Sequence, residues 1–422
     1  MRIIVIGAGV LGVTQAWYLA QDGHEVTVVD RAPRAGEGTS YANGGLIHAS
    51  HSEPWNAPGV LWQLLRWVGR EDSPLLLRPR HLPGLLRWGL GFLRNSTPAR
   101  FRRHTGVNAA LAVYSLGQLR ELRAATGLRY DDDQAGILKV FHDQQALDKA
   151  LHASGVMASH GVRYSVLDTQ QTVALEPALD ETRDQLVGGI YYPDDESGDA
   201  HLFTTRLAER AAEAGVRFNT ATDVRRLRTH KGRLVALETP DGDLAADAFV
   251  LAAGAESRRL AAQVGLRLPI YPVKGYSVTL PLAGWRNAPA IPLIDDARKV
   301  VLALLGDRIR IAGTAEFTGN DLRVNPGRAA SVLRQASGLF PSLGEHAEGL
   351  EPTYWAGLRP MTVDGPPILG PSPVSNLYLN TGPGHLGWTF ACGCSRIVAD
   401  VIRNRTPALG LEGVGLQRFR RW

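Results

Sequence analysis

The sequence predicts a mixed α/β (α+β) protein of two domains, in which a parallel-sheet domain is assembled from discontinuous segments and an antiparallel-sheet domain is inserted between them. Three observations predict this architecture. A strand–glycine turn–helix–strand pattern opens the chain, α/β patterns return over residues 188–254 and after residue 377, and alternating β patterns fill residues 270–313. With 422 residues, 44% of them hydrophobic, the chain is long enough for two or three units with ample cores.

The first element is a buried strand over residues 3–6, which runs into Gly7, Gly9 and Gly12 and then into a helix that ends at Gly23. Each glycine of this Gly-x-Gly-x-x-Gly motif has a physical task. Gly7 permits the tight strand-to-helix turn, Gly9 leaves room for a pyrophosphate beside the backbone, and Gly12 lets the helix pack closely on the sheet. The motif therefore predicts a Rossmann-like dinucleotide-binding domain.

The helix start and the second strand complete this predicted site. The free N–H groups at Val10 and Leu11, with the positive end of the helix dipole, face the phosphates of the dinucleotide. The second strand covers residues 25–29 and ends at Asp30 and Arg31. The Asp30 carboxylate is placed to accept hydrogen bonds from ribose hydroxyls.

Hydrophobic periodicity predicts the later elements in chain order. A glycine-rich polar loop covers residues 36–45. A stretch rich in Leu, Trp and Arg follows over residues 54–103, with helical spacing at Leu61, Leu64, Leu65, Val68 and at Leu86, Leu90, Leu93. Further helices are expected over residues 108–126, 202–214, 327–338 and from 388 onward. Further strands are expected over 136–141, 188–192, 216–219, 222–228, 234–239, 248–252, 271–280, 300–304, 308–312 and 377–380.

The α/β patterns at the start, middle and end of the chain are separated by material of a different kind. We therefore expect the dinucleotide-binding domain over residues 1–55, 185–265 and 345–422, and a substrate-binding domain over residues 56–184 and 266–344, with approximate boundaries.

NAD(P) and FAD both use the N-terminal motif, so other features must choose between them. A nicotinamide dehydrogenase usually completes its sheet within one continuous stretch, whereas here cofactor-like pieces recur far downstream. A strand that ends at Ala253 and Gly254 suits a site that admits a nucleotide. A second Gly-x-Gly-x-x-Gly, at Gly382, Gly384 and Gly387, aims helix-start N–H groups at the negative charge of a reduced flavin. Together these features favour FAD.

Five motifs carry a family resemblance over essentially the whole chain. They are Thr-Ser-Tyr-Ala-Asn-Gly-Gly at 39–45, Pro-Trp-Asn-Ala-Pro-Gly at 54–59, Tyr-Pro-Val-Lys-Gly-Tyr-Ser at 271–277, Gly-Leu-Arg-Pro-Met-Thr-Val-Asp-Gly at 357–365, and residues 384–393. The chain resembles the FAD-dependent amine and amino-acid oxidoreductases of the D-amino-acid oxidase superfamily, and within it the bacterial branch that oxidises free D-amino acids.

The resemblance implies which residues contact the substrate. Arg359, in the Gly-Leu-Arg-Pro motif, is expected to hold the substrate carboxylate, a task that suits a planar guanidinium with a permanent charge. Tyr276 is expected as a second contact to the carboxylate or as a lid over it, with a core tyrosine on a strand as the alternative. Tyr271 is a further candidate for this role. Glu316 is expected either near the substrate amine or on a neighbouring arginine.

The resemblance also implies the contacts of the cofactor. The loop that contains Ser40, Asn43, Gly44 and Gly45 is expected to pass the pyrophosphate and the isoalloxazine ring, and Val224 to contact the adenine side through its backbone. The C-terminal contacts are expected at Gly384, His385, Leu386, Gly387 and Trp388. His48 and His51 follow the loop; His48 is a catalytic candidate, and a structural role is the alternative for both.

The chain contains two cysteines, Cys392 and Cys394. Relatives that attach flavin covalently use a cysteine near the C-terminal region. Here both cysteines lie inside the final helix pattern rather than before it, so we expect non-covalent FAD. Two cysteines this close are also too few for a disulfide framework or a metal site, and no metal is expected.

The implied reaction is oxidative deamination of a free D-amino acid to a 2-oxo acid and ammonia. Hydride passes from the α-carbon to flavin N5, and the electrons continue to a quinone or another non-oxygen acceptor. The alternatives are a related enzyme that acts on glycine, sarcosine, D-hydroxyproline or an opine, a flavin-binding subunit of a hetero-oligomer, and a nicotinamide dehydrogenase.

The net charge and the hydropathy of the sequence limit which binding partners and which cellular location are expected. The formal net charge is +5, but no nucleic-acid motif or basic block accompanies it, so no nucleic-acid partner is expected. No apolar run reaches the roughly 18 residues of a membrane span, and no signal peptide is expected before the first strand, which predicts a cytoplasmic protein. Residues 54–103 carry Trp55, Trp62, Trp67 and Trp88. They suit a peripheral contact at the inner face of the plasma membrane that leads quinone to the flavin; a core-facing helical pair is the alternative.

Overall fold

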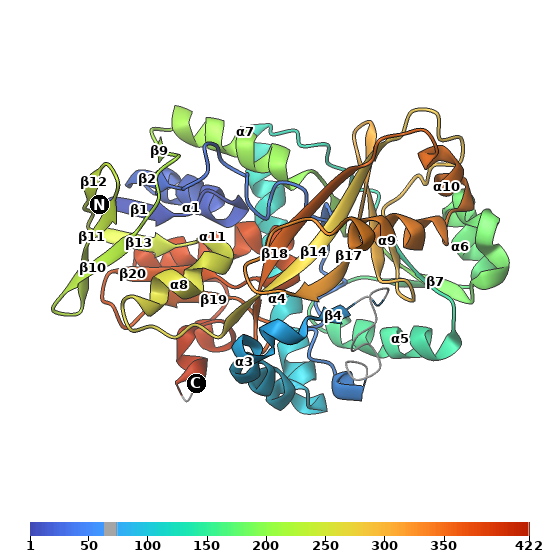
Figure 1. Cartoon of the computed structure of the whole chain (residues 1–422), viewed down its shortest axis with the longest axis horizontal. Helices are drawn as coiled ribbons and strands as arrows, with labels where there is room; N and C mark the ends of the chain where they lie inside the picture. The colour runs from blue at the N-terminus through green and yellow to red at the C-terminus, as the bar shows by residue number, and fades with distance from the viewer. Residues whose placement is uncertain (63–72, 74, 421) are drawn as a thin grey trace.

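The structure is a computed structural model that describes residues 1–62, 73, 75–420 and 422. Leu64, Leu65 and Val68 of the expected helical pattern, and Trp67 of the expected membrane contact, lie outside the described residues. The fold is built around a six-stranded and a nine-stranded sheet, which occupy the two halves of the molecule (Figure 1). The mixed α/β architecture expected from the sequence is confirmed.

The six-stranded sheet has the strand order β19-β20-β13-β1-β2-β9. All of its neighbouring pairs are parallel except β19 with β20. Its strands are β1 (Arg2–Ile6), β2 (Glu25–Val29), β9 (Arg217–Asn219), β13 (Ala248–Leu251), β19 (Ile368–Pro371) and β20 (Leu377–Thr381). Helix α1 (Val10–Gln21) connects β1 to β2, so the opening motif forms the parallel unit that the glycine spacing predicts.

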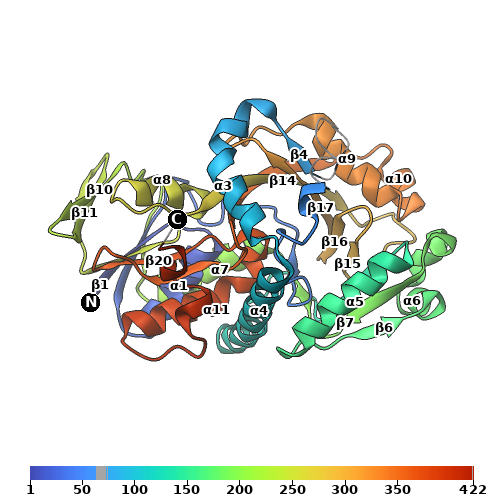
Figure 2. The ribbon, with the colours of Figure 1, turned by 90° about the horizontal axis from the view of Figure 1, so that it is seen from below.

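Four helices pack together beside this sheet. Helix α11 (Gly387–Ile402) contacts α1 and α4 (Pro98–Thr126), and α1 also contacts α7 (Ala200–Glu213) (Figure 2). Helix α4 begins at Pro98 rather than at the expected residue 108. The Thr97 side chain caps its N-terminus and Pro98 occupies the first helical position, where a missing N–H costs nothing.

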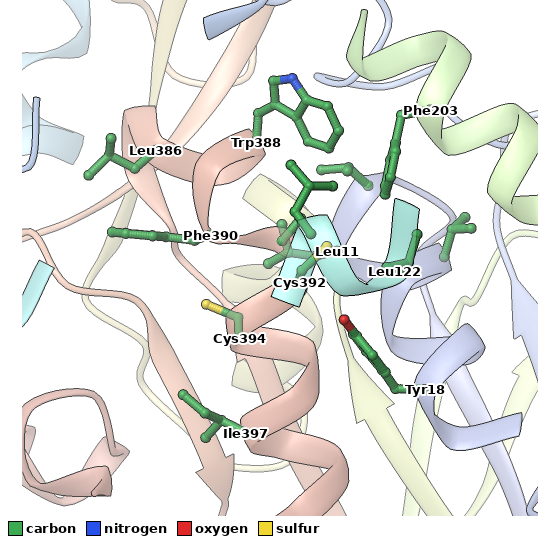
Figure 3. Packing of buried hydrophobic residues seen from close by; sticks show 14 of the residues in the cluster. Leu11, Tyr18, Leu122, Phe203, Leu386, Trp388, Phe390, Cys392, Cys394 and Ile397 are labelled. Carbon is green, nitrogen blue, oxygen red and sulfur yellow. The ribbon is translucent and has the colours of Figure 1, made fainter. Parts of the chain in front are cut away.

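Aromatic and aliphatic side chains from these helices form one buried core. Leu11 and Tyr18 of α1, Leu122 of α4 and Phe203 of α7 meet Phe390 of α11 there (Figure 3). Both cysteines belong to α11 and are buried in the same core as free thiols. Burial raises the pKa of the Cys392 thiol to about 12, so this sulfur behaves as an apolar packing group.

The nine-stranded sheet has the order β18-β14-β17-β16-β15-β5-β7-β6, and β4 pairs with β17. Its strands are β4 (Leu75–Leu77), β5 (Ile137–Phe141), β6 (Ser165–Leu167), β7 (Gly188–Tyr192), β14 (Ile270–Pro281), β15 (Leu293–Asp295), β16 (Val300–Leu305), β17 (Arg308–Phe317) and β18 (Thr353–Thr362). Most of its pairs are antiparallel; β15 with β5 and β17 with β4 are parallel. The helices of this half are α3 (Leu82–Asn95), α5 (Gln144–Ala158), α6 (Thr169–Leu175), α9 (Pro326–Ser337) and α10 (Pro341–Ala347).

Smaller elements complete the fold. β10 (Arg226–His230), β11 (Arg233–Thr239) and β12 (Gly242–Leu244) form a three-stranded antiparallel sheet, whose first turn is the predicted Lys231-Gly232 hairpin. β3 (Leu46–Ile47) pairs with β8 (Glu196–Ser197), and α8 covers Ser257–Ala262. Short 3₁₀ turns lie at Gly254–Glu256 and Gly384–Leu386.

The sheets combine segments in a way that local patterns do not reveal. β7 and β18 lie in the segments expected for the cofactor domain, yet they are strands of the nine-stranded sheet. Helix α4 lies in a segment expected for the other domain, yet it packs on α11 and also contacts α5. The expected domain boundaries remain a prediction.

Candidate active site

A cavity of about 1700 Å³ lies where the two large sheets meet. Its wall includes Gly9 and Asp30 from the six-stranded sheet and Gly275 and Arg359 from the nine-stranded sheet. Single-ligand pockets usually measure about 300–1,000 Å³, so this cavity has room for a dinucleotide and a second small molecule. Most of the residues that the sequence predicts for the cofactor and the substrate line it.

The first glycine turn has the close backbone approach that the motif requires. Gly7 has a φ of +113°, and a Cβ there would lie 2.5 Å from the carbonyl oxygen of Ala252. A Cβ at Gly12 would lie 1.8 Å from the carbonyl oxygen of Gly7. Larger residues at either position would push α1 away from the sheet. Gly12 therefore shapes the turn without lining the cavity, while Gly9, Val10 and Leu11 line it.

Two polar side chains organise the backbone around this turn. Asp30 accepts hydrogen bonds from the N–H of Ala8 (2.6 Å, Oδ2) and the N–H of Ala32 (2.8 Å, Oδ1), and Ser40 Oγ accepts from the N–H of Val10 at 3.0 Å. A carboxylate has about four acceptor positions, so Asp30 retains capacity for a ribose hydroxyl. Arg31 also lines the cavity.

The glycine-rich loop connects the two sheets. Asn43 Oδ1 accepts a hydrogen bond from the N–H of Gly45 at 3.0 Å. A Cβ at Gly44 would lie 3.1 Å from the Val301 side chain, and one at Gly45 would lie 3.0 Å from Ala303, both on β16. The loop therefore runs directly against the nine-stranded sheet, and its backbone borders the cavity.

The other predicted cofactor residues come from three distant segments. Val224, Ala253, Gly254, Gly384, His385, Gly387 and Trp388 line the cavity. Leu386 points into the core with 2% of its surface exposed, so it supports the start of α11 rather than the cavity wall. The first turn of α11 has no side-chain cap, which leaves its N–H groups for a bound anion or carbonyl.

Arg359 lies on β18 with its guanidinium in the cavity wall. Its Nη1 donates a hydrogen bond to the carbonyl oxygen of Thr314 at 3.1 Å, and its Cζ lies 5.6 Å from the centre of the Trp55 ring. In the part of the chain that the structure describes, no carboxylate lies within 4.0 Å of this guanidinium. Burial lowers the pKa of Arg359 to about 10, so it remains charged at neutral pH. A partly buried cation without an acidic partner in a cavity wall is suited to receive an anionic ligand.

The two predicted tyrosines lie in different surroundings. The Tyr276 hydroxyl donates a hydrogen bond to Glu316 Oε2 at 2.5 Å, and Glu316 also accepts one from Arg78 Nε at 2.7 Å. Tyr276 is among the residues that line the cavity, but its side chain lies on the face of β14 opposite to the one that Arg359 crosses, because side chains alternate along a strand. For Tyr276, this position agrees with the alternative of a core tyrosine. For Glu316, the hydrogen bond from Arg78 agrees with the alternative of a neighbouring arginine as its partner.

Tyr271 does not line the cavity. It is 3% exposed and packs with Trp88 and Phe317, whose ring centres lie 5.7 and 5.8 Å away. The Tyr271 and Tyr276 roles at the carboxylate remain predictions that these contacts do not favour.

Three histidines form a row along the cavity, of which His48 is buried and His51 and His385 are partly buried. The ring centres of His48 and His51 lie 5.5 Å apart, those of His51 and His385 also 5.5 Å, and Trp55 stacks on His385 at 5.5 Å. Nδ1 of His48 and of His51 is buried and has no hydrogen-bond partner among the described residues. Burial lowers the pKa of His48 to about 3 and that of His385 to about 4, and it also lowers the pKa of His51. All three rings are therefore neutral at physiological pH.

A buried lysine lies farther along the cavity. Lys139 Nζ lies 3.1 Å from Asp296 Oδ1. Burial lowers the pKa of Lys139, but the Asp296 and Glu53 carboxylates outweigh this effect and raise it. The lysine is thus a charged, paired group in the wall.

The residues present fit a bound FAD. The glycine backbones of the first turn and of the Gly44-Gly45 loop leave space that Cβ atoms would fill, and the start of α11, which no side chain caps, lines the same cavity with Gly387 and Trp388. Unpartnered buried polar atoms at His48, His51 and Thr314 border the remaining space. Such atoms are costly unless a ligand or water satisfies them.

Sequence reasoning missed three site residues. A lysine within the otherwise apolar run of β5 was a signal for Lys139, since buried lysines need a partner. Gly275 lies inside the Tyr-Pro-Val-Lys-Gly-Tyr-Ser motif at 271–277, but no local pattern shows that its missing side chain makes room for Arg359. Thr314 has a φ of +56°, which sequence does not predict for a β-branched residue.

A family model and several curated relatives match nearly the whole chain. The sequence model of the family DAO, described as FAD dependent oxidoreductase, matches residues 2–401. The chain is 49% identical over 420 residues to the D-amino acid dehydrogenase of Paramagnetospirillum magneticum, covering 99% of both chains. It is 47% identical over 412 residues to that of Dechloromonas aromatica, covering 96% of this chain and 98% of the other.

Solved structures share the fold over nearly the whole length. The L-proline dehydrogenase of P. horikoshii matches with a TM-score of 0.78 at 20% identity, covering 100% of this chain and 98% of the other. The glycine oxidase of Geobacillus kaustophilus matches with a TM-score of 0.74 at 25% identity, covering 99% of both.

Proposed function

The chain belongs to the DAO family of FAD-dependent oxidoreductases, and we propose that it catalyses the oxidative deamination of free D-amino acids to 2-oxo acids and ammonia. The observation that carries the proposal is the partly buried Arg359 guanidinium, which faces the cavity with no acidic partner within 4.0 Å among the residues described. The names of relatives that are 47–49% identical over almost the full length support the choice of substrate.

The chain's own residues bind and orient the amino acid. Arg359 presents a planar fork that pairs with a carboxylate through two hydrogen bonds. The neutral rings of His48, His51 and His385 add no charge to this wall, so they do not repel an ammonium group. When bound, FAD supplies the acceptor for the hydride that leaves the α-carbon. Holding the two reactants at a fixed distance is the main contribution of the protein to the rate.

The electron acceptor and its route are a second part of the proposal. We infer that a quinone or another non-oxygen carrier approaches through α3, whose Trp88, Phe92 and Leu93 line one end of the cavity. The outer side of the same helix exposes Leu82, Leu86 and Leu90, with 59% of Leu90 and 63% of Leu86 accessible.

The outer side of α3 suits an anionic membrane surface. Leucines four residues apart form one continuous apolar stripe, and Arg87 and Arg94 of the same helix supply positive charge. Trp62, nearby in sequence, has 71% of its surface exposed. No helix in the described ranges is both long and apolar enough to cross a bilayer, so the proposed contact is peripheral.

Anaerobic mixing of the purified holoenzyme with single amino acids tests the function. D-Alanine or D-proline should bleach the visible flavin absorption, and L-alanine should not. Bleaching only by glycine, sarcosine or L-proline would contradict the proposed substrate, and no bleaching by any amine would indicate a binding subunit.

An Arg359 variant tests the observation that carries the proposal. Arg359→Ala should raise KM for D-alanine by about 100-fold or more, because two charge-assisted hydrogen bonds are lost, while FAD stays bound. Exposed Arg226 on β10 provides a matched control, and Arg226→Ala should leave KM unchanged. An unchanged KM in Arg359→Ala would refute the carboxylate role.

A further inference from the structure

β17 contains a bulge directly beside the arginine of the site. Lys274 of β14 pairs with Glu316, and Tyr276 pairs with Gly313, so Thr314 and Ala315 together oppose the single residue Gly275. Thr314 takes a φ of +56°, a conformation that β-branched residues rarely adopt. A strained residue at a bulge in a cavity wall indicates a functional constraint at this position.

The bulge orients the guanidinium of Arg359 from across the sheet. β14 lies between β18 and β17, and the Arg359 side chain passes over Gly275 to reach the Thr314 carbonyl oxygen. A Cβ at Gly275 would lie 2.1 Å from Nη1, so only glycine leaves this path open. The Thr314 carbonyl oxygen accepts a hydrogen bond from one of the five N–H donors of the guanidinium. The remaining donors are available for a ligand.

The hydroxyl of Thr314 is a second polar group at the same place. Thr314 lines the cavity, and its Oγ1 is buried without a hydrogen-bond partner among residues with described positions. Thr314 carries both this hydroxyl and the carbonyl that accepts a hydrogen bond from Arg359, and both residues line the same cavity. A carboxylate paired with a guanidinium still has free acceptor positions.

We propose that Thr314 is a substrate-binding residue, whose carbonyl holds the Arg359 guanidinium in place and whose hydroxyl donates a hydrogen bond to the substrate α-carboxylate. The inference rests on the proposed function, because it takes an α-carboxylate as the ligand of Arg359. Thr314 thereby supplies the second carboxylate contact that the family resemblance implied for Tyr276, whose hydroxyl donates its hydrogen bond to Glu316.

Titration of the holoenzyme with propionate, the analogue of D-alanine without its amine, tests the assignment without turnover. Binding is followed through the visible flavin spectrum. Thr314→Val keeps the shape and the β-branch but removes the hydroxyl, and it should raise the propionate Kd by about tenfold or more. Thr314→Ser keeps the hydroxyl and should stay within about threefold of the wild-type Kd. FAD content and Tm of both variants should match the wild type.

Each contrary result has a distinct meaning. A wild-type Kd in Thr314→Val, or equal weakening in Thr314→Ser, would overturn the role of the hydroxyl. An unchanged propionate Kd with a raised KM for D-alanine would place the hydroxyl on the amine and overturn the carboxylate assignment. Failure of the wild type to bind propionate would overturn the carboxylate site as a whole. Propionate binding without D-alanine oxidation would instead contradict only the proposed function.

Discussion

At the scale of single residues, the site depends on the missing side chain of Gly275 as well as on the Arg359 guanidinium. The Arg359 guanidinium occupies the space above Gly275, and Thr314 receives it on the far side. An arginine at residue 359 alone would not fix the position of its charge. The glycine and the bulge together give the long side chain one orientation, which lowers the entropy cost of holding a ligand.

Gly275→Ala should therefore damage ligand binding more than stability. The new Cβ would displace Nη1, which is the end of a flexible side chain, so the free energy of unfolding should change little. The propionate Kd should rise by about tenfold or more, because the displaced fork no longer meets the carboxylate. Spectral titration and Tm measure the two effects. Gly155→Ala in α5, where a Cβ meets nothing within 4 Å, is the matched control. A normal Kd in Gly275→Ala would show that the guanidinium position does not matter.

The histidine row makes a separate prediction about acid stability. In the folded protein burial lowers the pKa of His48 to about 3 and that of His385 to about 4, whereas an unfolded chain titrates near the ordinary value of about 6.5. The unfolded state therefore binds protons first as the pH falls. This contribution to stability is complete above about pH 6.5 and is lost progressively below it.

His48→Asn should flatten the fall of Tm between pH 6.5 and 4.5, and His230→Asn, at an exposed position on β10, should not. The comparison uses the difference between variant and wild type, because Asp195 acts in the opposite sense. Burial raises its pKa to about 7, so its contribution falls as the pH rises from about 4 to 7. An unchanged slope in His48→Asn would contradict the buried neutral histidine.

Residue roles could be predicted from the sequence only where one residue type has one chemistry. The tasks of the glycines at 7, 9 and 12 follow from the physical requirements of their motif, whereas the role of Arg359 is implied by the family resemblance; the structure brings most of these residues to one cavity. Tyr276 illustrates the limit, because a tyrosine on a strand fits both a core and a site. The partner that decides its position, Glu316, lies 40 residues away on another strand.

At the scale of elements, helix α3 is apolar on two sides. Leu85, Trp88 and Phe92 face the interior, and Leu82, Leu86 and Leu90 face outward. A helix with apolar residues on both sides is normally covered on both sides. Within the described chain the outer stripe is exposed, and we therefore expect an external surface to cover it.

Leu86→Asp combined with Leu90→Asp should abolish binding to anionic vesicles, since charge on this stripe opposes burial in the interface. Flotation with vesicles that contain phosphatidylglycerol, at low salt, measures the effect. Val166→Asp on β6 is the control, because Val166 is half exposed but lies far along the chain from α3. Failure of the wild-type protein to float with the vesicles would contradict the membrane contact. Flavin bleaching by D-alanine should be unchanged in all variants.

Helices and strands that depend on local sequence could be predicted, but the strands with which they pair in the sheets could not. Hydrophobic periodicity and glycine turns suffice for β1, α1 and β2, because all their determinants lie within 29 residues of one another. Pairing of β18 with β14, or of β7 with β5, depends on side chains distant in sequence. The segments expected for the cofactor domain therefore contain two strands, β7 and β18, that join the nine-stranded sheet.

At the scale of the whole molecule, one cavity joins the two sheets. Gly7, Gly9 and Asp30 approach it from the six-stranded sheet, and Gly275 and Arg359 from the nine-stranded sheet. The Gly44-Gly45 loop packs against β16, and α4 contacts helices of both halves. A ligand in this cavity contacts both halves at once, so its binding energy is shared between them.

Removal of FAD should therefore lower the Tm of the entire chain in one step. A ligand that binds only the folded state adds about 1.4 kcal/mol of stability for each tenfold increase in its free concentration above Kd. Differential scanning calorimetry of the apoprotein titrated with FAD should show a single unfolding transition, whose Tm rises with each addition of FAD. FMN, which lacks the adenosine monophosphate half of FAD, should raise Tm less, because it would not reach the adenine contact predicted at Val224, a residue of the cavity wall. Two transitions, of which FAD moves only one, would show that the halves unfold independently and that the cavity does not couple them.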